Sequence, residues 1–295
     1  MKNACMLLGV GILLALPLSV DGWQGRRARC PYLDEPRPFF DLEWGVTGNA
    51  RTENDGSRYA QMELRSEAAL GYFHDILQGD MDLGLRLDQT MPMRRAAFRA
   101  PRHLMVLAVD GRWFWRYNDV TAFELQFAPG IYASSQDLLD SPLNMPVTAS
   151  GVFTLDRSLA LVAGLQVRHG FQYRWVPHAG VAWHPHPQFR LDAMVPETRM
   201  TVHLDRAWAC YAGWSWESTT YHVKPDLIGR DRLTITNQEI YMGVSHAFSP
   251  ELQVYGSLGW LMDRQLRRSR SHSGARESID IDDAPIIRMG VSGAF

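Results

Sequence analysis

The sequence has few cysteines, almost no net charge and no long apolar run beyond its N-terminal segment. Only 3 of its 295 residues are cysteine, too few for the disulfide framework that holds many small secreted domains together. The formal net charge of −2 gives no electrostatic reason to expect a nucleic-acid partner. After the first segment, no stretch approaches the ~18–20 apolar residues of a membrane-spanning helix.

The N-terminal segment has the layout of an export signal. A short, positively charged start at Met1–Asn3 precedes the almost wholly apolar stretch Met6–Leu18, and Val20–Gly22 offers a cleavage site. We expect residues 1–22 to be a cleaved secretory signal peptide, with an uncleaved anchor as the alternative. Residues 23–38 show no strand pattern, and we expect them to form a periplasmic N-terminal tail.

Alternation of apolar and polar residues with a period of two recurs through most of the remaining chain. In the first such segment Phe40, Leu42 and Trp44 are apolar, whereas Asp41 and Glu43 between them are charged. Further segments begin near Gln61, Met81, Phe123, Leu159, Trp208 and Leu252. A two-faced strand fits a soluble β-sandwich, with its polar face in solvent, and also a membrane β-barrel, with its polar face inside.

The connections between these segments alternate in length, which favours the barrel. The short ones are Tyr117–Asp119, Asp156–Ser158, His184–Gln188, Leu204–Arg206 and Ser249–Glu251. The long ones are Thr47–Ser57, Gln89–Arg102, Ser134–Pro146, His222–Arg232 and Gln265–Asp283, and Pro196–Glu197 is an exception. Barrels of the bacterial outer membrane have short turns at one end and long loops at the other, whereas a sandwich has no reason to sort its loops.

The predicted fold is therefore all-β: a closed antiparallel up-and-down transmembrane β-barrel over residues 39–295, with about 14 strands. Merging of short strands around Pro185, Pro187 and Pro196 would reduce the count to about 12. Closure also removes the unpaired edge strands that an open sheet of this length would expose. The last segment, Ala284–Phe295, alternates as well, and its final phenylalanine suits the aromatic girdle at a lipid–water boundary.

Charged residues on the polar faces are the candidate functional residues, because in a barrel they would line the lumen. They are Asp41, Glu43, Glu63, Arg65, Glu67, Asp82, Arg86, Asp88, Glu124, Arg168, Arg190, Asp192, Glu217, Glu239 and Arg288. Acids outnumber bases. One interpretation is that these charges pair across strands in a closed or narrow structural barrel. The other is an aqueous pore with a mild preference for cations, since rings of carboxylates favour them.

Metal and catalytic sites are weakly indicated. His178, His184 and His186 lie close in sequence, but zinc sites need three or four convergent ligands, and His186 lies between two prolines in a turn. We therefore expect neither metal nor cofactor. His272 and Ser273 fall in a charged segment where a fixed catalytic geometry is not expected. The prediction is a non-enzyme, with a barrel-embedded lipid hydrolase as the alternative.

The segment Trp183–Pro196 resembles a Trp-x-Pro-turn-strand-Pro pattern of an uncharacterised family of bacterial outer-membrane β-barrel proteins, a domain family of unknown function. The strands that follow, through Trp216, and the aromatic C-terminal strand are also similar. The resemblance implies an outer-membrane barrel and brings no substrate or catalytic residue. The ending is similar to outer-membrane proteins in general, which implies that Phe295 is an insertion signal for the barrel-assembly machinery.

Together these observations predict an exported protein of the cell outer membrane with porin-like passive transport or a structural role in the envelope. The expected partners are outer-membrane lipids, the assembly machinery and small solutes. A secreted soluble β-sandwich that binds a ligand is kept as a rival prediction. Pairing of Cys30 with Cys210 is left open.

Overall fold

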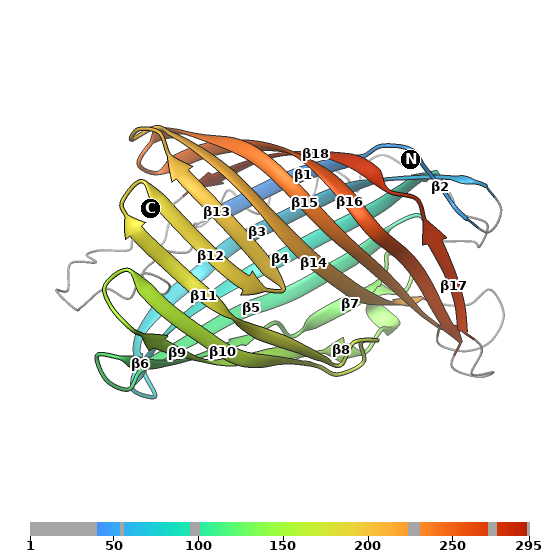
Figure 1. Cartoon of the computed structure of the whole chain (residues 1–295). Coiled ribbons are helices and arrows are strands. Elements are labelled where there is room, and N and C mark those ends of the chain that lie inside the picture. The colour runs from blue at the N-terminus through green and yellow to red at the C-terminus, as the bar shows by residue number, and fades with distance from the viewer. Residues whose placement is uncertain (1–39, 54–55, 95–100, 224–230, 271–275, 294–295) are drawn as a thin grey trace.

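The structure is a computed structural model that describes residues 40–53, 56–94, 101–223, 231–270 and 276–293. Strands make up 80% of it, and Figure 1 shows them arranged as a tilted barrel. The elements are β1 (Phe40–Thr47), β2 (Ala50–Arg51), β3 (Arg58–Ile76), β4 (Gly79–Arg94), β5 (Leu104–Arg116), β6 (Thr121–Phe127), β7 (Gly130–Ser134), the 3-10 helix η1 (Leu138–Asp140), β8 (Leu143–Asn144), β9 (Pro146–Thr154), β10 (Leu159–Arg168), β11 (Trp175–His186), β12 (Phe189–Val195), β13 (Glu197–His203), β14 (Trp208–Val223), β15 (Asp231–Ser249), β16 (Leu252–Arg270), β17 (Arg276–Ile281) and β18 (Ala284–Gly293). No helix in the described part of the chain is long and apolar enough to cross a membrane.

The first and last strands pair with each other, so the sheet closes. Phe40 of β1 lies opposite Gly293 of β18 on one side and Ala68 of β3 on the other. Four pairs of consecutive elements, β1/β2, β6/β7, β8/β9 and β17/β18, each form one strand of the wall. The result is a closed barrel of 14 antiparallel strands. This confirms the predicted fold and the count of 14.

The short strands around Pro185, Pro187 and Pro196, which the sequence pattern left open to merging, are separate in the structure. Ala179 of β11 pairs with Val195 of β12, and Ala193 of β12 pairs with Thr198 of β13. The three strands therefore stand side by side, and the alternative of 12 strands is wrong. Pro196 alone connects β12 with β13, which explains the exception in the pattern of connections.

Connections are sorted by length between the two ends of the barrel, as predicted. The end that we call the turn end carries the connections 77–78, 117–120, 155–158, 187–188, 204–207 and 250–251. The opposite end, the loop end, carries the connections 135–142 and 169–174 and the strand ends that flank residues 54–55, 95–100, 224–230 and 271–275, which the structure does not describe. Pro196 lies on the same side of β12 but lower in the wall, where it accepts a hydrogen bond from the nitrogen of Trp216 in the middle of β14. The turn end lies on the left in Figure 1 and the loop end on the right.

Local hydrogen bonds shape the short turns. Asp205 accepts hydrogen bonds from the backbone nitrogens of Ala207 and Trp208, both at 2.7 Å. Asp156 accepts one from the nitrogen of Ser158 at 2.6 Å. An aspartate that binds the backbone two or three residues ahead favours a tight reversal over continuation of the strand.

The outer face of the wall is apolar and is bordered by aromatic side chains. Near the turn end Trp115 stacks on Phe123 with ring centroids 5.5 Å apart, and Tyr117 packs against Trp115 at 5.6 Å. Near the loop end Trp175 and Trp260 are exposed on the outside. Two aromatic borders around an apolar band match the girdles of a transmembrane barrel.

The polarity of the wall inverts towards the loop end. On β16, Leu258 faces outward and is 62% exposed, whereas Leu266 faces inward and is 1% exposed. Between them Asp263 has a positive φ of 47° and lies in an irregularity that shifts the pairing with β15. Beyond this bulge the outward Gln265 hydrogen-bonds to Asp280 at 2.9 Å. The bulge changes which residues face inward, so the same strand is apolar outside in the membrane-facing part of the wall and apolar inside at the loop end.

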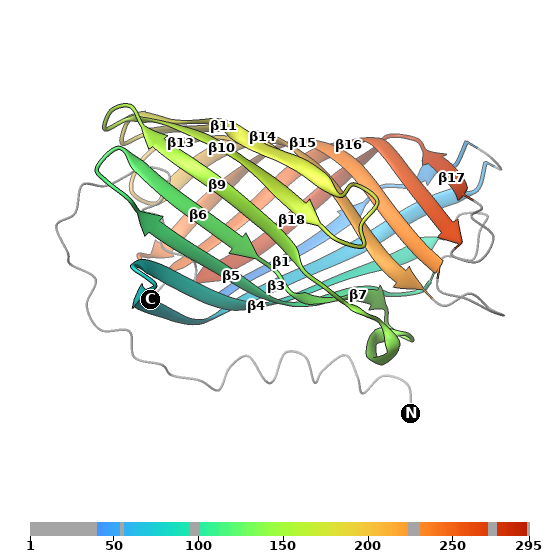
Figure 2. The same cartoon turned by 90° about the horizontal axis from the view of Figure 1, so that it is seen from below.

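Inward apolar side chains fill the loop end of the barrel, and we call this cluster the loop-end seal. It consists of Ala50, Tyr59, Leu104, Val106, Ala108, Tyr132, Phe171, Tyr221, Val223, Leu233, Ile235, Leu266, Ile279, Ile281 and Ala284, all buried. The barrel narrows here because β14 leans towards β7, where His222 pairs with Ala133. Figure 2 shows β7 next to the loop end of the barrel.

A short segment covers the edge of β14 at this narrowing. Arg168 donates to the carbonyl oxygen of Ser218 at 2.8 Å, and the nitrogen of Gln172 donates to Thr220 at 3.1 Å. Phe171 packs on Tyr132 with ring centroids 5.1 Å apart. The free edge of the long strand is thereby covered rather than exposed.

Some predicted loops are strands. The prediction of a long loop over Gln265–Asp283 is wrong, because β16 continues to Arg270 and β17 pairs with it. The same holds for part of Gln89–Arg102, since β4 extends to Arg94. Polar residues that face outward above the bulge hide the alternation that marks the rest of the barrel. The signal peptide (1–22), the tail (23–38), Cys30, His272–Ser273 and Phe295 lie outside the described residues.

Candidate functional site

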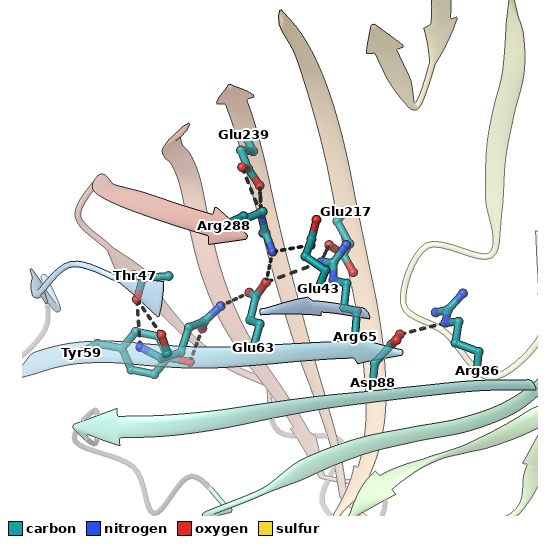
Figure 3. Close-up of polar contacts among 11 residues, drawn as sticks. Glu43, Thr47, Tyr59, Glu63, Arg65, Arg86, Asp88, Glu217, Glu239 and Arg288 are labelled. Atoms are coloured by element: carbon teal, nitrogen blue, oxygen red, sulfur yellow. Dashed lines mark hydrogen bonds and ion pairs between the residues drawn. The ribbon is translucent and has the colours of Figure 1, made fainter. Parts of the chain in front are cut away.

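The charged residues predicted to face the lumen come from strands all around the barrel. Most of them make hydrogen bonds or ion pairs with one another or with polar residues that the sequence did not single out. They form a buried cluster around Arg288, a bridge between Arg65 and Glu217, and smaller groups around two cavities. Figure 3 shows the first two groups and the neighbouring Arg86–Asp88 pair.

Arg288 of β18 lies where three carboxylates meet. Its Nη1 donates to Glu63 at 2.6 Å and to Glu43 at 3.2 Å, and its Nη2 donates to Glu239 at 2.9 Å. The arginine side chain is only 9% exposed. Gly45, its partner on β1, makes room, because a Cβ there would lie 3.0 Å from Nη1. One planar guanidinium therefore ties together β1, β3, β15 and β18 through charge-assisted hydrogen bonds.

The cluster continues along β3 towards the loop-end seal. Gln61 donates to Glu63 at 2.5 Å and accepts from the hydroxyl of Tyr59 at 2.8 Å. Thr47 of β1 accepts from the backbone nitrogen of Gln61 at 2.8 Å. Because Tyr59 belongs to the seal, the hydrogen-bonded network borders directly on the apolar cluster.

Arg65 and Glu217 form a bridge across the lumen. Arg65 Nη2 lies 2.6 Å from Glu217 Oε2, although β15, β16, β18 and β1 stand between β14 and β3 in the wall. The two side chains are 39% and 49% exposed, so the bridge is accessible to water inside the barrel. Two cavities lie in the lumen, which we call cavity A and cavity B, and both residues of the bridge line cavity B.

Cavity A has a volume of about 560 Å³ and lies on the β4–β12 side of the lumen. Arg86 pairs with Asp88 at 2.8 Å, and Arg112 pairs with Glu124 at 2.5 Å. Glu67, Asp82, Arg168 and Arg190 also line this cavity. Positive and negative side chains thus both line this cavity.

The charges near β11 and β12 form a separate small group. Arg190 donates to Asp192 at 2.5 Å, and His184 lies 3.1 Å from the other oxygen of Asp192. His186 accepts from the backbone nitrogen of Gln188 in the turn at 3.2 Å. Among the residues that the structure describes, no three His, Cys, Asp or Glu side chains converge as a metal site would require.

Cavity B has a volume of about 810 Å³ and reaches the turn end, where Ser249, Pro250 and Leu252 line it. Its walls carry Glu43 and Glu239 of the Arg288 cluster and Asp41, which accepts from the hydroxyl of Tyr255 at 3.0 Å. Tyr211 and Tyr241 line it as well. The cavity is therefore both acidic and aromatic.

The sequence did not single out several charged residues that line the cavities, namely Asp110, Arg112, Glu197, Arg199 and Arg206. Asp110 and Arg112 share the inward side of β5 with buried Leu104, Val106 and Ala108. That side is apolar at the seal and charged at the cavity, so no single polar face is visible in the sequence. The pair Glu197 and Arg199 lies on the short strand β13, directly after the one-residue connection.

No protein-family model matches the chain, and no curated protein matches it. Solved structures with a similar fold include the NanC porin, with 10% identity over 87% of this chain and 100% of that chain at a TM-score of 0.43. An outer-membrane channel from Pseudomonas putida F1 matches with 10% identity over 92% of this chain and 100% of its own at a TM-score of 0.45. LpxR from Salmonella typhimurium matches with 9% identity over 86% and 100% at a TM-score of 0.35.

Proposed function

We propose that the chain is an outer-membrane β-barrel that gives small polar solutes a porin-like route, with the loop-end seal as its gate. The apolar outer face with its aromatic borders supports insertion in a bilayer, where a closed barrel satisfies every backbone group of the wall. The turn end then faces the periplasm and the loop end faces outward.

The observation that carries the proposal is the charged lumen. Two cavities of about 560 and 810 Å³ lie inside the wall and are lined by acidic and basic side chains. A barrel of this strand number is wider than one of about eight strands, which its own side chains fill. Because acids predominate, the passage should prefer cations over anions.

The loop-end seal makes this the closed conformation. Leu104, Leu233 and Leu266 are among its most deeply buried members. Leu233 and Leu266 lie on the paired strands β15 and β16, and Leu104 lies on the distant strand β5. Apolar constrictions in channels stop conduction by excluding water, and they conduct once they are wetted. The seal also favours the second candidate function, a permanently closed barrel with a structural role in the envelope.

A soluble β-sandwich and a barrel-embedded lipid hydrolase receive less support. Closure of the sheet argues against a soluble β-sandwich, because a sandwich consists of two open sheets packed face to face. From the sequence, no catalytic geometry is expected around His272 and Ser273, and both residues lie outside the described part of the chain.

Two measurements test the proposal. Cell fractionation should recover the protein only with detergent from the outer membrane, and recovery in the soluble fraction would contradict the location. In planar bilayers under a salt gradient, the purified protein should give infrequent current steps whose reversal potential indicates a cation preference. Complete absence of current at every salt concentration would leave the structural role as the better explanation.

A further inference from the structure

Cavity B has an aromatic wall built from three tyrosines on neighbouring strands. Tyr211 lies on β14, Tyr241 on β15 and Tyr255 on β16, and all three line the cavity. The rings of Tyr211 and Tyr241 lie 6.2 Å apart between centroids. We call these three residues the tyrosine wall.

Glycines on the adjacent strands fix how the rings lie. A Cβ placed on Gly213 would come within 2.6 Å of the hydroxyl of Tyr241, and one on Gly243 within 2.5 Å of the ring of Tyr211. One on Gly290 would overlap the ring of Tyr255. The hydroxyl end of each ring therefore lies over a glycine of the neighbouring strand. The planes of the Tyr211 and Tyr241 rings are inclined by 64°, and all three rings line the cavity.

Hydrogen bonds from the hydroxyls make these rings richer in electrons. Tyr241 donates to the carboxylate of Glu197 at 3.2 Å, and Tyr255 donates to that of Asp41 at 3.0 Å. A phenol that shares its proton with a carboxylate carries more negative charge on its ring. The attraction of the ring face for a cation rises accordingly.

One face of the wall already holds a cation. The guanidinium carbon of Arg199 lies 4.4 Å from the centre of the Tyr211 ring. This distance is within the range of a cation–π contact. The geometry at Tyr211 shows how a positive group fits over a ring of this wall.

The remaining charges of cavity B favour a positive ligand. Glu43 and Glu239 are bound to Arg288, and Glu217 is bound to Arg65. The other charged residues that line the cavity are Asp41, Glu197, Glu251, Arg199 and Arg206. These five residues are three acids and two bases, and one of the bases, Arg199, is already stacked on the Tyr211 ring.

We propose that cavity B binds an organic cation with ammonium groups, which enters from the turn end and lies along the faces of Tyr241 and Tyr255. The inference deepens the proposed function by naming a ligand class for the lumen. A linear polyamine suits this lining, because it carries several separated ammonium groups and the lining offers Asp41, Glu197 and Glu251. Its methylene groups would cover the rings between these contacts.

The test is titration calorimetry of the detergent-purified full-length protein with spermidine at low salt. Tyr241→Leu removes a ring face and should weaken binding by about 2- to 30-fold, the range of a cation–π contact. Glu197→Gln keeps a hydrogen-bond acceptor and removes a charge, so it should weaken binding less. Glu277→Gln on β17, at the loop end, is the matched control and should bind as the unchanged protein does.

The outcomes separate this inference from the proposed function. Absence of spermidine binding, or equal affinity in Tyr241→Leu and Glu277→Gln, would overturn the inference. Full displacement of spermidine by Mg²⁺ at equal charge concentration would also overturn the inference, because it would mean that the acidic side chains attract any cation and that the rings contribute nothing. Binding without bilayer current would contradict conduction and leave the inference standing. Circular dichroism of each variant checks that the barrel has folded.

Discussion

Replacement of Arg288 by methionine is the most informative perturbation of the interior. The arginine is 9% exposed and binds Glu43, Glu63 and Glu239. Methionine preserves much of the volume but leaves three carboxylates close together without their cation. Removal of one partner from a buried ion pair costs about 3–5 kcal/mol, because the remaining charge is stranded in a poorly solvated place. We expect the free energy of unfolding to fall by about this amount.

Arg65 provides the matched control within the same lumen. It forms an equally short ion pair with Glu217, but the two side chains are 39% and 49% exposed. Its contact with Glu63 is longer, at 3.6 Å, and Glu63 keeps its ion pair with Arg288 when Arg65 is replaced. Ion pairs that water reaches contribute about 0–1 kcal/mol, since solvent screens the charges. Arg65→Met should therefore lower the free energy of unfolding by about 1 kcal/mol or less.

The assay is urea unfolding and refolding in detergent micelles, followed by the fluorescence of the 10 tryptophans. Comparison of the two variants at equal slope gives the difference in stability directly. Equal losses in Arg288→Met and Arg65→Met would refute the argument that burial decides the strength of these pairs. A loss below about 1 kcal/mol in Arg288→Met would refute it as well.

Three further predictions use the same unfolding assay. Arg264 is 2% exposed, and its Nε and Nη2 have no hydrogen-bond partner among the described residues. Because a buried charge without full pairing is costly, Arg264→Met should leave the free energy of unfolding unchanged or raise it. A clear loss of stability would contradict this. Leu266→Ala opens a cavity in the loop-end seal and should cost about 2–5 kcal/mol, whereas a smaller loss would indicate a loosely packed seal. The backbone nitrogens of Trp208 and Ala207 lower the pKa of Asp205 from its ordinary value of 3.8, so its stabilising effect is present above that pH and is lost as pH falls below it. The difference in stability between Asp205→Asn and the unchanged protein should therefore shrink from pH 7 to pH 3, and a constant difference would contradict the role of the ionised carboxylate.

The sequence predicts the barrel well where one face is lipid-facing and the other is polar. It fails where the polarity of the wall inverts, as at Asp263, because outward polar and inward apolar residues beyond the bulge look like a loop. It also misses the turn after β3, where Leu77 and Gln78 have positive φ of 52° and 67°. Neither leucine nor glutamine is typical of a turn with positive φ, so the local sequence does not indicate a turn here.

The partners of the lumenal charges are harder to predict than their positions. Alternation suggests that Arg65 and Glu217 belong to polar faces, yet 152 residues separate them along the chain. Their contact depends on the number of strands and on the lean of β14 towards β7, which are properties of the whole barrel. The same holds for Arg288, whose three carboxylate partners come from three different strands.

The central claim is that the apolar seal closes the charged lumen. Its most direct test is single-channel recording of the unchanged protein beside Leu266→Ser/Ile279→Ser, two polar replacements on paired strands within the seal. We predict rare openings in the unchanged protein and sustained, cation-preferring current in the variant, because water can enter a polar constriction. A correctly folded variant that remains without current would contradict the account.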